Sequence, residues 1–88
     1  MSDVDALIAQ LNALHDEALE ALDAARDAEA LEAVRITYLG RKEGRISGVL
    51  RGLGGLDPAD RPRVGQEANR VKAAIQARLD EVDAVLAA

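Results

Sequence analysis

Nine basic side chains between residues 35 and 72 are the groups in this 88-residue sequence whose type and spacing could bind a charged ligand. They are Arg35, Arg41, Lys42, Arg45, Arg51, Arg61, Arg63, Arg70 and Lys72. An arginine guanidinium can donate two hydrogen bonds to one phosphate group. The chain has no Phe or Trp and a single Tyr, so stacking of unpaired bases has little support. The pattern favours contacts with the backbone and shape of a folded RNA or a duplex.

The charges are unevenly distributed, so the net charge of −5 conceals a basic middle. Residues 35–78 carry ten Lys and Arg against four Asp and Glu, a balance of +6, whereas residues 1–25 carry six acids and no Lys or Arg. The middle could bind a polyanion that the first segment would repel. The alternative interpretation is that these arginines only keep a helical surface soluble.

Residues suited to catalysis or metal binding are scarce. His15 is the single histidine, there is no Cys, and no set of His and carboxylates has metal-ligand spacing. The glycines of residues 40–55 lack the G-x-x-x-x-G-K-[ST] phosphate-binding pattern. A self-contained enzyme is therefore disfavoured. For Tyr38 we expect a ring packed beneath a turn, with its hydroxyl group bonded to the backbone, rather than a contact with RNA.

Apolar residues at heptad spacing predict two long helices, over about residues 3–26 and 60–87, which position these charges. The first seam is Val4, Leu7, Leu11, Leu14, Ala18, Ala21 and Ala25, and the second is Val64, Ala68, Val71, Ile75, Leu79, Val82 and Leu86. Ser2 or Asp3 can cap the first helix, and Asp57 or Asp60 can cap the last.

Two shorter helices are expected between the long ones, over residues 28–39 and 45–53. Asp27 is a candidate N-cap, Gly40 is a candidate left-handed residue at a helix end, and a break at 26–28 stays open. The expected fold is all-α, with one domain over residues 1–88: an antiparallel helical hairpin, or coiled coil, with a short helix in the connecting region. Such a hairpin would bring the basic residues together at one end.

The cellular location is expected to be cytoplasmic. No apolar run approaches the roughly 20 residues of a membrane span. The acidic start lacks the basic region of a signal peptide, and the absence of Cys fits a reducing compartment.

Several short motifs occur in order along the chain. Tyr38-Leu39-Gly40-Arg41-Lys42, then Gly44 and Ile46-Ser47, is similar to Y-L-G-[KR]-K-G-x-[LI]-[TS], with Glu43 as one inserted residue. Leu56-Asp57-Pro58, Asp60-Arg61-Pro62 and Gly65 are similar to L-x-P-E-E-R-P-x-x-G, and Asn69 and Lys72 to N-x-x-K. Over residues 18–88 the series resembles the N-terminal coiled-coil domain of bacterial phenylalanine–tRNA ligase alpha subunits.

The resemblance implies a tRNA-binding arm that contacts the body of tRNA(Phe) and projects from an assembly of two alpha and two beta subunits. It implies that the complete enzyme is an ATP-dependent class II ligase using Mg²⁺. This chain lacks the catalytic domain, so we expect no enzyme activity by itself, no cofactor, and no DNA or membrane partner. The alternative is a structural helical module for subunit assembly or self-association. Clustered, solvated cations would favour RNA, whereas an exposed apolar seam would favour assembly.

Overall fold

The computed structural model describes residues 3–42 and 44–88; the candidate cap Ser2 and the inserted Glu43 lie outside them. The helices are α1 (Asp3–Ala24), α2 (Ala28–Leu39), α3 (Arg45–Leu50) and α4 (Arg61–Ala87), with a 3₁₀ helix η1 (Arg51–Gly55) after α3. This part of the chain contains no strand, which confirms the predicted all-α fold.

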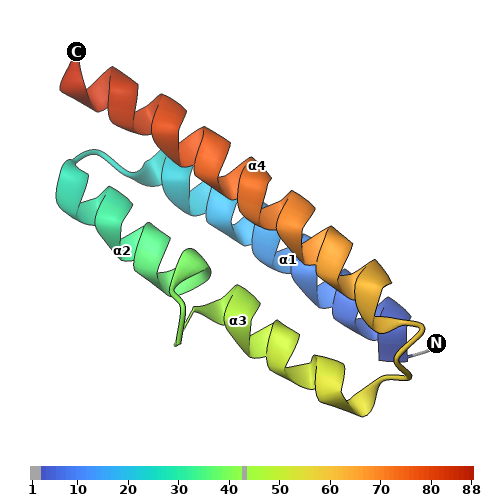
Figure 1. The fold of residues 1–88 in the computed structure, drawn as a ribbon. Coiled ribbons are helices and arrows are strands. Elements are labelled where there is room, and N and C mark those ends of the chain that lie inside the picture. The colour runs from blue at the N-terminus through green and yellow to red at the C-terminus, as the bar shows by residue number, and fades with distance from the viewer. Residues whose placement is uncertain (1–2, 43) are drawn as a thin grey trace.

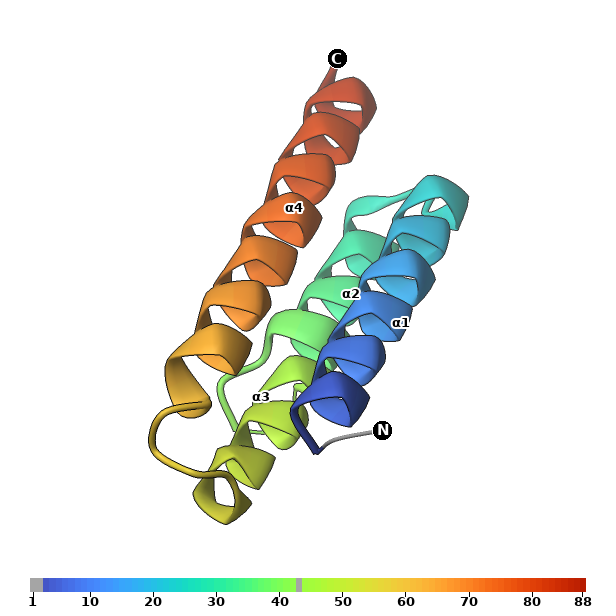
Figure 2. The same ribbon diagram turned by 90° about the vertical axis from the view of Figure 1, so that its right-hand side faces the viewer.

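The helices form a rod with extents of 47 × 19 × 17 Å. Figures 1 and 2 show that α3 and η1 continue the line of α2, and that the chain reverses after α1 and again after η1. The predicted antiparallel hairpin packing therefore occurs, at two reversals rather than one: α1 with α2, and α3 with α4. Because two reversals separate them, the long helices α1 and α4 run side by side in the same direction. Arg70 bonds to Asn12, and Arg78, further along α4, bonds to Asp23, further along α1. This order of partners is the one that parallel helices require.

The break between α1 and α2 is real and is capped on both sides. Asp27 has an extended backbone (φ −151°, ψ 170°), and its carboxylate accepts a 2.8 Å hydrogen bond from the Ala30 amide, as expected of an N-cap. Arg26 donates to the carbonyl oxygens of Asp23 and Ala25, where the last turn of α1 leaves acceptors without helical partners. α1 consequently ends at Ala24, two residues before the expected boundary.

Residues 57–60 form a separate turn before α4, so the helix does not begin at Asp57. The Asp60 amide bonds to the Asp57 carbonyl oxygen at 2.9 Å, and Asp60 takes the N-cap position without a side-chain capping bond. Pro62 lies in the first turn of α4, where a missing amide hydrogen costs no helical bond. Of the two candidate caps, only Asp60 therefore directly precedes the helix.

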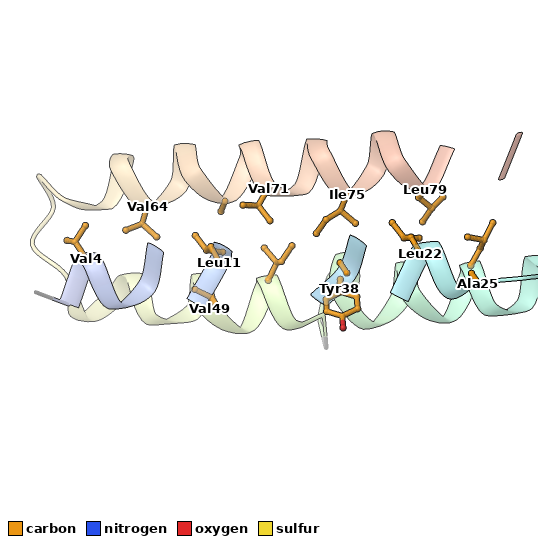
Figure 3. Close-up of a cluster of buried hydrophobic side chains, with 14 of the residues drawn as sticks. Val4, Leu11, Leu22, Ala25, Tyr38, Val49, Val64, Val71, Ile75 and Leu79 are labelled. Atoms are coloured by element: carbon orange, nitrogen blue, oxygen red, sulfur yellow. The ribbon is translucent and has the colours of Figure 1, made fainter. Parts of the chain in front are cut away.

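The core is a narrow apolar strip along the rod (Figure 3). Both predicted seams supply it; the fully buried side chains are Leu11, Ala18, Leu22, Ile46, Val64, Ala68, Val71 and Ile75. The strip opens at the C-terminal end of α4, where Val85 is 74% and Leu86 38% exposed. Arg78 already lies opposite Asp23, so the last turns of α4 extend beyond the end of α1.

Candidate nucleic-acid interface

The joint between α2 and α3 brings two glycines into close contact. A Cβ atom on Gly44 would lie 2.6 Å from the Gly40 amide nitrogen and closer still to the Gly40 carbonyl oxygen. A Cβ atom on Gly40 would lie 2.6 Å from the Ile36 carbonyl oxygen. Gly40 has φ −58° and ψ 142°, so the expected left-handed conformation is wrong. Glycine is needed here because the two backbone segments approach each other, not because of an unusual φ.

Side chains from α3 and from the first residue of η1 contact the joint. The Ser47 hydroxyl group donates a 2.8 Å hydrogen bond to the Gly40 carbonyl oxygen, and the Arg51 guanidinium donates to the Lys42 carbonyl oxygen. Arg45 lies over the Tyr38 ring, 5.6 Å from its centre, and pairs with Glu17 of α1 at 3.3 Å. The joint is thus fixed to α3 and, through Arg45, to α1.

The Tyr38 ring packs as expected, but its hydroxyl group does not form the expected hydrogen bond within the described residues. The residue is 7% exposed, and its ring forms part of the buried cluster. Figure 3 shows the hydroxyl oxygen pointing away from that cluster. Within residues 3–42 and 44–88 it has no hydrogen-bond partner, so the expected backbone bond is not found there.

Three of the nine candidate cations are compensated by carboxylates. Arg35 pairs with Glu32, Arg45 with Glu17, and Arg70 with Glu67. The hydrogen bonds from Arg35 and Arg70 lower the pKa of the Glu32 and Glu67 carboxyl groups, respectively. Arg70 also donates a 3.0 Å hydrogen bond to the Asn12 side chain of α1. Arg45 and Arg70 thus also link α3 and α4 to α1, whereas Arg35 pairs within α2.

The other six candidates form no ion pair with any described residue: Arg41, Lys42, Arg51, Arg61, Arg63 and Lys72. Arg51 donates to the backbone carbonyl oxygen of Lys42, and Arg61 donates to those of Leu53 and Gly54. Their partners are therefore neutral, and no carboxylate offsets their positive charge. The charge of Arg63 contributes to the lowered pKa of Glu67 without direct contact. Arg41 and Lys42 are exposed at the joint.

The basic residues do not gather at one end of the rod, as a single hairpin would have required. Figure 1 shows the joint that carries Arg41 and Lys42 partway along the rod, whereas α4 begins, with Arg61 and Arg63, at the end where η1 lies. The difference arises because α3 continues the line of α2 instead of turning back. The result is two basic regions, one at the joint and one at the η1–α4 end.

Two contributors were not among the sequence candidates. Arg78 pairs with Asp23 and so joins the end of α1 to α4, and it also pairs with Glu81 within α4. Ser47 braces the joint although it carries no charge. The i,i+3 spacing of Arg78 and Glu81 marks their pair in the sequence, but nothing marks the pair with Asp23, because the facing register of α1 and α4 is set by the tertiary fold.

An apolar groove lies at the open end of the rod. It has a volume of about 450 Å³ and is lined mainly by the ends of α1 and α4, including Leu22, Ala25, Val82, Val85 and Leu86. The observation expected for an assembly module is therefore present at this end.

The described residues also bear on the predictions about His15, metal binding and membrane spans. Among the described residues, the His15 ring forms a hydrogen bond or ion pair only with the neighbouring Asp16, at 3.1 Å. No group of three or more His, Cys, Asp or Glu side chains in residues 3–42 and 44–88 could hold a metal ion. In the same ranges, none of the helices has the length and apolar character needed to cross a membrane.

A family profile described as the N-terminal domain of class II aminoacyl-tRNA synthetases matches residues 26–88. The chain belongs to that family. The profile begins near the break between α1 and α2, so it covers the joint and both basic regions of this N-terminal domain. No solved structure was found to match the chain.

Curated relatives of this N-terminal domain are phenylalanine–tRNA ligase alpha subunits. The protein of Desulforamulus reducens is 48% identical over 75 residues, which cover 85% of this chain and 22% of the relative. That of Geobacillus thermodenitrificans is 49% identical over 71 residues (81% and 20%), and that of Geobacter metallireducens 49% over 72 residues (82% and 21%). The chain thus matches about a fifth of the length of these relatives.

Proposed function

We propose that the chain is a tRNA-binding helical arm that contacts the body of tRNA(Phe) by backbone and shape. In this role it supports aminoacylation by a complete phenylalanine–tRNA ligase. The observation that carries the proposal is the joint, where Arg41 and Lys42 are exposed and Arg51 keeps its charge, on a chain whose net charge is −5. Membership in a synthetase N-terminal domain family supports the same proposal.

In this proposal the arm has no catalytic residue of its own. ATP, Mg²⁺ and phenylalanine bind elsewhere in the alpha subunit, which joins the beta subunit in an α₂β₂ cytoplasmic enzyme. The arm supplies binding energy for tRNA, so its cations act on charging through tRNA affinity. Amino-acid activation uses no tRNA and is independent of these residues.

The test measures binding of fluorescently labelled tRNA(Phe) to the 88-residue chain over a range of salt concentrations. In the double variant Arg41→Gln/Lys42→Gln, binding weakens and the slope of log K against log salt falls by roughly 0.7–0.9 for each lost phosphate contact. The control Ala9→Glu/Gln10→Glu changes the net charge by the same amount on the exposed surface of α1. It should leave the slope near that of the unchanged chain.

The alternative function is a helical module for assembly, favoured by the groove around Val85 and Leu86. If the Arg41/Lys42 variant binds tRNA(Phe) with unchanged affinity and slope, the joint is not an RNA site. Concentration-dependent self-association in sedimentation, abolished by Val85→Glu, would then support assembly instead.

A further inference from the structure

We propose that Ser47 and Arg51 are positioning residues, which hold the α2–α3 joint so that Arg41 and Lys42 meet the RNA backbone as a prearranged pair of charges. This inference rests on the proposed function. It assigns a task to two residues that make no ion pair with the described residues and whose side-chain hydrogen bonds go to the joint.

The connection needs such a brace because of its composition. Gly40 and Gly44 flank it, and glycine leaves the backbone more freedom to lose on ordering than any other residue. Arg41 and Lys42 lie on this connection, outside any helix. Without restraint, each charge would have to be immobilised when RNA binds, which reduces affinity.

Ser47 and Arg51 are placed to supply that restraint. They are four residues apart across α3 and the start of η1, so they lie on the same helical face. The Ser47 hydroxyl group holds the carbonyl oxygen at one side of the connection, that of Gly40. Arg51 holds the carbonyl oxygen of Lys42 itself, next to the proposed contact. Two bonds from one rigid face therefore hold the backbone carbonyl groups directly before Arg41 and directly after the Lys42 Cα atom, on the two sides of the Arg41–Lys42 pair.

Positioning and direct contact make different predictions for salt dependence. A residue that contacts phosphate releases counterions, so its loss lowers the salt slope. A residue that only orders its neighbours changes affinity but leaves the contacts, and the slope, in place. Ser47 gives the cleaner test because the serine hydroxyl group is uncharged.

The experiment compares Ser47→Ala and Arg51→Ala in the unchanged chain and in an Arg41→Ala/Lys42→Ala background. We expect Ser47→Ala to weaken tRNA(Phe) binding by about 2- to 13-fold for each side chain that must then be ordered on binding. Its salt slope should equal that of the unchanged chain. In the double-alanine background, both substitutions should have little further effect, because nothing remains to be positioned. Ser47→Thr, which keeps the hydroxyl group, should bind tRNA(Phe) as tightly as the unchanged chain does.

A matched control is Gly48→Ala, in the same helix, where an added Cβ atom would meet nothing within 4 Å. It should leave binding unchanged. Helix content from circular dichroism checks that every variant is folded at the binding temperature. Loss of binding that tracks loss of helix content would overturn the positioning role.

The outcomes separate the two proposals. If Arg41→Ala/Lys42→Ala leaves tRNA binding unchanged, the proposed function fails and this inference fails with it. A second outcome is that this variant binds weakly, and that Ser47→Ala or Arg51→Ala lowers its affinity by the same factor as in the unchanged chain. In that case the joint binds RNA and only the positioning role is refuted. A slope lowered by roughly 0.7–0.9 in Arg51→Ala alone would make Arg51 a direct contact instead.

Discussion

Replacing Gly44 with alanine should destabilise the protein, although its backbone geometry suits any residue. Gly44 has φ −62° and ψ 145°, so alanine brings no conformational strain and restricts the unfolded chain, which alone would stabilise by about 0.4–1 kcal/mol. The new Cβ atom would, however, lie 2.6 Å from the Gly40 amide nitrogen and nearer to its carbonyl oxygen. Carbon atoms prefer neighbours at about 3.5–4.0 Å, so one backbone segment must move by about 1 Å.

Overpacking of this kind typically costs about 1–3 kcal/mol. For a domain of this size, each kcal/mol corresponds to about 4–8 °C in melting temperature. After the gain of about 0.4–1 kcal/mol is subtracted, the net loss is up to about 2.6 kcal/mol. Gly44→Ala should therefore melt below the unchanged chain, by up to about 10–20 °C, measured by circular dichroism at 222 nm. The matched substitution Gly48→Ala adds the same methyl group inside α3 where nothing lies within 4 Å. It should raise the melting temperature, since alanine stabilises a helix interior by about 1 kcal/mol over glycine. Equal shifts in the two variants would refute the close approach of residues 40 and 44.

Two further predictions concern helix ends and charge pairs. Asp27→Ala removes a capping bond to the Ala30 amide and should cost about 0.5–2 kcal/mol in urea unfolding; Asp60→Ala, at an N-cap without such a bond, is the control, and an equal loss would contradict the capping role. The Arg70 hydrogen bond lowers the pKa of Glu67 below its ordinary value of 4.5, so this pair stabilises the folded chain above that pH and loses its contribution as pH falls through the lowered pKa. Glu67→Gln should therefore be less stable than the unchanged chain at pH 7, with the difference shrinking below pH 4.5; a difference that is the same at all pH values would argue against the pair.

The helices follow from local signals, whereas their arrangement does not. Heptad spacing predicts both seams, and the carboxylate of Asp27 identifies the start of α2, because these effects act within one or two turns. The relative direction of α1 and α4 depends on whether the chain between them reverses once or twice. That choice rests on α3 continuing the line of α2, which local spacing does not determine.

The sequence predicts which basic residues the candidate interface contains, but not which of them pair with distant carboxylates. The excess of Lys and Arg over residues 35–78 is visible in the sequence. The partners of Arg45 and Arg78, Glu17 and Asp23, are 28 and 55 residues away along the chain, and only the folded structure shows these pairs. Likewise, Gly40 is marked by its residue type, but the close approach to Gly44 that requires glycine is a tertiary contact.

The parallel packing of α1 and α4 sets an order of events during synthesis. Asn12 and its partner Arg70 are 58 residues apart, so the first helix leaves the ribosome well before the helix that covers it. At about 5–20 residues per second, α1 waits roughly 3–12 s for that partner. During this interval α2 can already pack against it through the short reversal at residues 25–27, while the side of α1 that later meets α4 stays open to water. The acidic residues along α1 give the nascent segment a strong negative charge, which discourages association with other chains until α4 arrives.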